Sequence, residues 1–199
     1  MQKPPVFAVA LILASVAPYS HSAVIPYGAE IQRSIQVLSP DGKAESERLF
    51  TEFHIRSSNG STYQETTGTD AVSGRKLDPS KAIENTQLGQ SYIINERLKT
   101  VLIRPPMMRG SGQSRRYAPS LERKIFLGRT CVVFATDGGE LWIDEELGLP
   151  MFRRTETQLP GGKRMIHTSR VLKLTTGREP NPELFTPSLE GYKVESPWK

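Results

Sequence analysis

The side chains that most often do chemistry are few in this chain, and their spacing does not bring them together. Of the three histidines, His21 falls in the leader described below, while His54 and His167 each stand alone on the polar face of an alternating segment. A zinc site needs Cys and His ligands at short, fixed spacings, and the chain has a single cysteine, Cys131. We therefore expect both histidines at the surface, and we expect neither a metal nor another cofactor.

Nucleophilic and acid–base chemistry has no local signature either. No glycine-rich phosphate loop and no Gly-x-Ser-x-Gly elbow occurs in the sequence. Asp144, Glu145 and Glu146 lack the ligand spacing of a calcium loop, so we expect them at a solvated turn tip. Catalytic groups can also come together from distant residues, but these patterns favour a protein that is not an enzyme.

Composition and charge narrow the class of partner. The 199 residues fit one domain, and the 37% hydrophobic content allows an ordinary core. The formal net charge is +5, but Lys and Arg are scattered between acids, so the chain lacks the footprint of a nucleic-acid-binding protein. Such a mildly basic chain could favour anionic partners such as lipid headgroups.

The N-terminal residues have the pattern of a secretory leader. Lys3 supplies a positive charge, residues 6–17 form an apolar run too short to span a bilayer comfortably, and small residues follow Pro18. We expect residues 1–23 to be a cleaved signal peptide and residues 24–199 to form a single domain. The chain would then be exported to a periplasm and would not span the membrane after cleavage.

The rest of the chain alternates between short strands and turns. Apolar and polar residues alternate in segments 30–38, 48–56 and 164–174, as in half-buried strands. Further strands are expected at residues 62–67, 91–95, 100–103, 124–127 and 130–136. Residues 68–90 lose this period, which predicts a loop with at most one short helix. Residues 105–117 read as a solvated loop whose arginines could clamp an anion, although plain solvation is the simpler interpretation.

Residues 139–157 predict a β-hairpin. Leu141-Trp142-Ile143 is a short apolar run, residues 144–148 form a polar turn with Gly148, and the chain returns from Leu149 onward. Amphipathic helices are almost absent. This pattern favours a mainly β fold, with an antiparallel sheet that curls into a sandwich or an open barrel.

Several motifs together resemble a known family. They are Ser39-Pro40-Asp41-Gly42-Lys43, residues 93–100, residues 142–150, and Pro182-Glu183-Leu184-Phe185-Thr186-Pro187 followed by Gly191-Tyr192-Lys193. With the leader, they resemble exported proteins of the outer membrane lipoprotein-sorting type, within the LolA/LolB-like superfamily. The resemblance implies a strongly curved, unclosed antiparallel half-barrel with a few short helices or loops on its concave side.

The resemblance also implies two functions. Carriers of the superfamily hold lipoprotein acyl chains on an apolar concave side, and a related branch binds partner proteins and regulates envelope stress. For the first function, lipid or acylated protein cargo, the apolar strand positions are the candidate lining residues: Ile35, Val37, Phe53, Ile55, Ile94 and Ile103. The alternative is an interaction or stress-sensing module that binds an envelope protein and no lipid.

Overall fold

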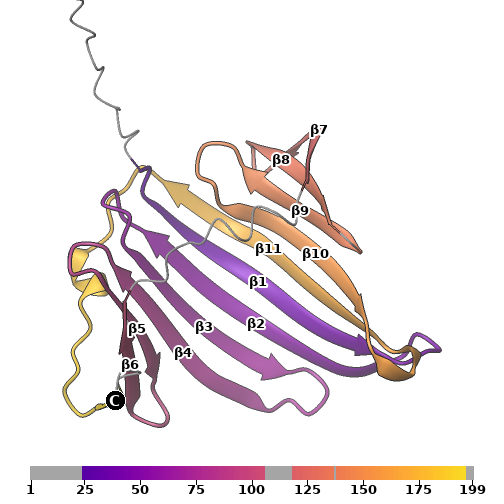
Figure 1. The fold of residues 1–199 in the computed structure, drawn as a ribbon, viewed down its shortest axis with the longest axis horizontal. Helices are drawn as coiled ribbons and strands as arrows, with labels where there is room; N and C mark the ends of the chain where they lie inside the picture. Colours follow the sequence, from indigo (N-terminus) through magenta and orange to yellow (C-terminus); the bar gives the residue numbers. More distant parts are fainter. Residues whose placement is uncertain (1–23, 106–117, 137, 196–199) are drawn as a thin grey trace, which may run out of the picture.

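The computed structural model describes residues 24–105, 118–136 and 138–195. These residues form a single twelve-stranded sheet (Figure 1). Its strands are β1 Tyr27–Leu38, β2 Ala44–Arg56, β3 Thr62–Asp70, β4 Lys76–Asn85, β5 Gln90–Asn95, β6 Thr100–Arg104, β7 Ala118–Phe126, β8 Arg129–Thr136, β9 Gly139–Asp144, β10 Pro150–Gln158, β11 Arg164–Thr176 and β12 Lys193–Glu195. Two 3-10 turns, η2 Pro160–Gly162 and η3 Pro182–Phe185, are the helical elements of the described ranges.

The order of strands confirms the predicted fold class. Across the sheet the order is β12-β6-β5-β4-β3-β2-β1-β11-β10-β9-β8-β7. Among the described strands every neighbouring pair is antiparallel except β12 and β6. The sheet curls strongly but its two edges do not meet, so it is an unclosed half-barrel (Figure 1).

The predicted loop at residues 68–90 is wrong, because β3 continues to Asp70 and β4 occupies residues 76–85. In the sequence, Asp78-Pro79 argued against a strand, because proline has no N–H group to donate to a sheet ladder. The structure places Pro79 at a register shift opposite Thr66–Gly68 and just before Ser80, where pairing with β5 begins. The missing N–H therefore falls where the ladder is already interrupted.

A β-bulge near the β1–β2 turn decides which side of the sheet each side chain of β2 occupies. Val37 pairs with Ser46 and Leu38 with Ala44, so Glu45 is an extra residue on β2. A one-residue shift exchanges the two faces of a strand. Odd-numbered residues of β1 consequently share a face with even-numbered residues of β2, beginning with Ile35 opposite Arg48.

The apolar residues pack in two clusters. The first joins β1, β8, β10 and β11 to the β9–β10 turn, and comprises Tyr27, Ala29, Ile31, Cys131, Leu147, Leu149, Met151 and Val171. Cys131 is fully buried there, as expected of a lone cysteine in an apolar strand. The second lies on β4–β6 and comprises Ile83, Tyr92, Ile94, Val101 and Phe185.

The C-terminal segment covers the second cluster. Phe185, in η3, is 4% exposed, and its carbonyl accepts a 3.0 Å hydrogen bond from the side chain of Asn85. Trp198 and residues 106–117, including most of the predicted arginine loop, lie outside the described residues.

Candidate functional site

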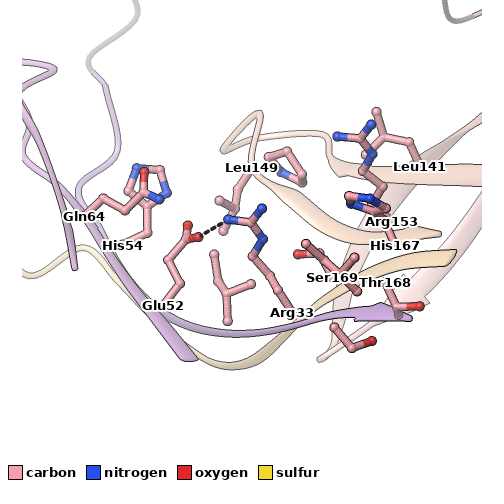
Figure 2. A pocket seen from close by; sticks show the side chains of 14 residues that line it. Arg33, Glu52, His54, Gln64, Leu141, Leu149, Arg153, His167, Thr168 and Ser169 are labelled. Atoms are coloured by element: carbon pink, nitrogen blue, oxygen red, sulfur yellow. Dashed lines mark hydrogen bonds and ion pairs between the residues drawn. The ribbon is translucent and has the colours of Figure 1, made fainter. Parts of the chain in front are cut away.

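An open cavity of about 680 Å³ lies on the concave side of the sheet. Figure 2 shows side chains of β2 and β3 on one side of this trough, Arg33 near its floor, and side chains of β9–β11 on the other side. Five lining residues are apolar: Ile31, Ile35, Leu141, Leu149 and Pro150. The others are polar, and the charged or titratable ones are Arg33, Glu52, His54, Arg153 and His167.

An ion pair crosses the floor of the trough. Arg33 Nη1 donates to Glu52 Oε2 at 3.1 Å, and the guanidinium lies 6.0 Å from the ring centroid of Phe50. Glu52 is only 8% exposed. A carboxylate this buried needs a charged partner, so Arg33 is required for the local fold as well as available to a ligand.

Arg56 fastens the β9–β10 turn beside the cavity. Its Nη1 donates to the carbonyl of Leu147 at 2.9 Å and its Nη2 to that of Ile25 at 3.0 Å. The same guanidinium stacks 4.5 Å from the Tyr27 ring, whose hydroxyl lies 3.5 Å from His54 Nδ1. These contacts hold the turn that brings Leu149 to the cavity wall.

Asp144 organises that turn from within, which corrects the prediction of a solvated position for this acid, whereas Glu145 and Glu146 are exposed as predicted. Asp144 is 1% exposed, and both its oxygens accept hydrogen bonds from Arg129, one of them at 3.1 Å. Its Oδ1 also accepts the backbone N–H groups of Glu146 at 3.0 Å and Leu147 at 2.8 Å. Burial disfavours the charged form, but the Arg129 and backbone hydrogen bonds outweigh it and lower the pKa of Asp144 below its usual value.

The wall opposite Glu52 carries a row of side chains from three adjacent strands. Arg33 on β1 pairs with Ser169 on β11, which pairs with Arg153 on β10. His167 occupies the next row, opposite Ile35. Burial, then the positive charges of Arg153 and Arg33, lower the pKa of His167. Burial is the main cause of this lowered pKa, and the two guanidinium groups add to it.

The structure separates the six predicted lining residues. Ile35 lines the cavity, and Val37 shares its face of β1. The register places Phe53, Ile55, Ile94 and Ile103 on the opposite face of the sheet. There, Phe53 is 45% exposed, and the other three belong to the second cluster or pack against it.

Histidines and charged residues also line the cavity, although the sequence patterns did not indicate this. His54 and His167, which were expected at the surface, line the open cavity and are half-buried there. Glu52 and Arg153 were not singled out from the sequence. In the sequence, the one indication of a charged site was Arg33, a charged residue on the apolar face of its strand.

The described residues contain no group of three or more His, Cys, Asp or Glu side chains placed to hold a metal ion. In the same part of the chain, no hydrogen bond joins Ser169 or Thr168 to His167. Nor do the described residues include a helix with the length and apolar character needed to cross a bilayer.

The fold and the cavity define a curved-sheet protein with an open concave site. No family model and no curated protein matches the chain. Solved structures do: MucB in complex with MucA(peri), at 18% identity and a TM-score of 0.38, covers 81% of this chain and 54% of its own. PNGF-II follows at 11% identity and a TM-score of 0.37, with 86% of this chain and 31% of its own.

A domain from Vibrio parahaemolyticus, described as that of an outer membrane lipoprotein-sorting protein, also matches. It shows 11% identity and a TM-score of 0.28 over 81% of this chain and 89% of its own. This chain spans about half the length of the MucB complex chain and less of PNGF-II. TM-scores this low say nothing about what this chain binds.

Proposed function

We propose that this chain is an exported binding protein whose concave trough holds an amphiphile, either a lipid or the acyl portion of a lipid-linked protein. The cavity of about 680 Å³ carries this proposal, because the side chains of the described residues leave it open. The second cluster, in contrast, is covered by the C-terminal segment. Ile31, Ile35 and Leu149 offer apolar surface to a chain, and each buried methylene contributes about 0.8 kcal/mol.

The contacts within the trough support binding better than catalysis. Glu52 is engaged by Arg33, and Ser169 is not hydrogen-bonded to His167 in the part of the chain that the structure describes. A nucleophile needs a base within hydrogen-bond reach. The proposed role is therefore to bind and release a ligand unchanged.

The first experiment is native mass spectrometry of the protein from the envelope fraction, with lipid extraction. We expect a lipid or acylated peptide to be released on denaturation. Ile35→Trp, which fills the trough, should lower uptake of added lipid about tenfold, the effect of losing roughly 1.4 kcal/mol of binding. Leu49→Trp is the matched control, because Leu49 pairs with Ser34 on the opposite face and is 39% exposed. A clean apo mass with no uptake of added lipid would contradict the proposal.

The polar and charged lining residues favour a second candidate ligand, a segment of a partner protein. The Arg33–Glu52 pair and Gln64 offer polar contacts that an acyl chain cannot use. A photo-crosslinker at position 35 would then capture a polypeptide in the native envelope, whereas one at position 49 would not.

A further inference from the structure

The concave trough has more positive than negative charge, and the excess lies on one wall. Arg33, Arg153 and Glu52 are the charged residues that line it, and Glu52 is taken up by Arg33. Among the described residues, no carboxylate lies within ion-pair distance of Arg153. Arg153 is solvent-exposed, so its guanidinium is open to a ligand.

The surrounding groups suit an anion. Arg153, Ser169 and Arg33 stand in one cross-strand row, so the two arginines are two strand spacings apart, about 10 Å along the sheet. Between them, the Ser169 hydroxyl can donate a hydrogen bond. A guanidinium presents paired N–H donors that match a carboxylate or phosphate. In Figure 2, Arg153 and His167 lie close together on the same wall.

Apolar lining lies next to this row. Leu141 pairs directly with Arg153, and Ile35 with His167. A ligand with both an acidic group and an apolar chain would satisfy both kinds of surface at once. A neutral amphiphile would leave Arg153 without a negative partner.

Building on the proposed function, we propose that the trough selects amphiphiles with an acidic headgroup, which Arg153 binds with help from Ser169 and Arg33. The shared chemistry is a phosphate or carboxylate attached to an acyl chain. Arg33 contributes its charge while remaining paired with Glu52, and Arg153 supplies the selectivity.

The test compares two single-chain lipids with the same tail below their critical micelle concentrations: lysophosphatidylglycerol, which carries an anionic phosphate, and monoacylglycerol, which is neutral and has no phosphate. We expect the protein to bind the anionic lipid at least about tenfold more tightly, as one charge-assisted hydrogen bond would give. Arg153→Gln should remove this preference while leaving the affinity for monoacylglycerol unchanged, which also shows that the variant is folded.

Arg154→Gln is the matched control. It removes the same charge from the next residue of β10, whose side chain belongs to the opposite face and contacts Glu156 at 3.7 Å. This variant should keep the full preference. Equal binding of the two lipids by the unmodified protein would overturn the headgroup proposal and leave amphiphile binding standing, whereas binding of neither lipid would refute the proposed function itself.

Competition with inorganic phosphate distinguishes a site for a lipid headgroup from a site for a free anion. We expect phosphate to compete only weakly, since it lacks the chain that contacts Ile35 and Leu141. Competition by phosphate as effective as that by unlabelled lysophosphatidylglycerol would overturn the proposal in favour of a site for a free anion.

Discussion

At the scale of the residue, two buried carboxylates fix the positions of elements that form the trough. Glu52 and Asp144 are both buried carboxylates, and each has an arginine partner from another strand. Such pairs contribute little to net stability compared with apolar packing, but breaking one leaves an uncompensated charge. Both residues are therefore best understood as fixing the position of a strand or turn rather than as reactive groups.

Asp144→Asn tests this view. The amide can still accept the backbone N–H groups of the turn, but it leaves Arg129 without its buried partner, so we expect a loss of about 3 kcal/mol in the free energy of unfolding. Urea denaturation measures the loss. Glu146→Gln removes the exposed partner of the same arginine, 70% exposed at its side chain, and should change stability by less than about 1 kcal/mol. Equal effects of the two substitutions would refute the assignment.

At the scale of the element, the β9–β10 hairpin agrees closely with its sequence pattern. The predicted apolar run 141–143 lies in β9, and the returning strand is β10. The close approach of β9 and β10 at one end of this hairpin depends on Gly139, where an added Cβ would lie 1.8 Å from the carbonyl oxygen of Arg154. Only a residue without a side chain allows the two backbones to approach this closely.

Gly139→Ala should therefore destabilise the protein by more than about 2 kcal/mol, because backbone atoms must separate. Gly28→Ala is the control. It places a Cβ 3.3 Å from the Thr175 hydroxyl, a side-chain atom that can move, and should have a much smaller effect. Thermal unfolding of both variants measures the difference, and a Gly139→Ala protein as stable as the parent would contradict the close approach.

At the scale of the whole molecule, the C-terminal segment completes the sheet. Beyond η3, Tyr192 donates a hydrogen bond to Glu96, and β12 pairs with β6. Hydrogen bonds from Lys81 and Tyr192 lower the pKa of Glu96 to about 2. This carboxylate thus stabilises the docked segment above its ordinary pKa, and its contribution is lost as the pH falls towards 2.

The buried anchor of this segment is Phe185. Phe185→Ala should lower the free energy of unfolding by about 3–5 kcal/mol, as large-to-small substitutions in cores do. Val194→Ala, at a residue 51% exposed in the same segment, should change it by less than about 1 kcal/mol. Guanidinium denaturation checks both values. A small effect at Phe185 would mean that the segment only rests on the sheet.

The amino-acid sequence by itself determined most of the strands and most of their turns. Alternation and turn residues located β1, β2 and β11, because a half-buried strand must alternate and a reversal needs residues such as Asp41-Gly42. Alternation and turn chemistry depend on neighbouring residues only, so local sequence is enough to predict them. Many short strands with almost no helical pattern predicted an antiparallel sheet that curls into a sandwich or an open barrel, and the unclosed half-barrel among these was what the family resemblance implied.

Tertiary structure decided which face of each strand became the cavity wall. The extra residue Glu45 exchanges the faces of β2, so Glu52 and His54 point into the trough, while Phe53 and Ile55 point away from it. Alternation gives the period of a strand, but only the register between strands gives its orientation. The same register aligned Arg33 with Arg153, residues far apart in the sequence, to form the charged wall on which the proposed selectivity depends.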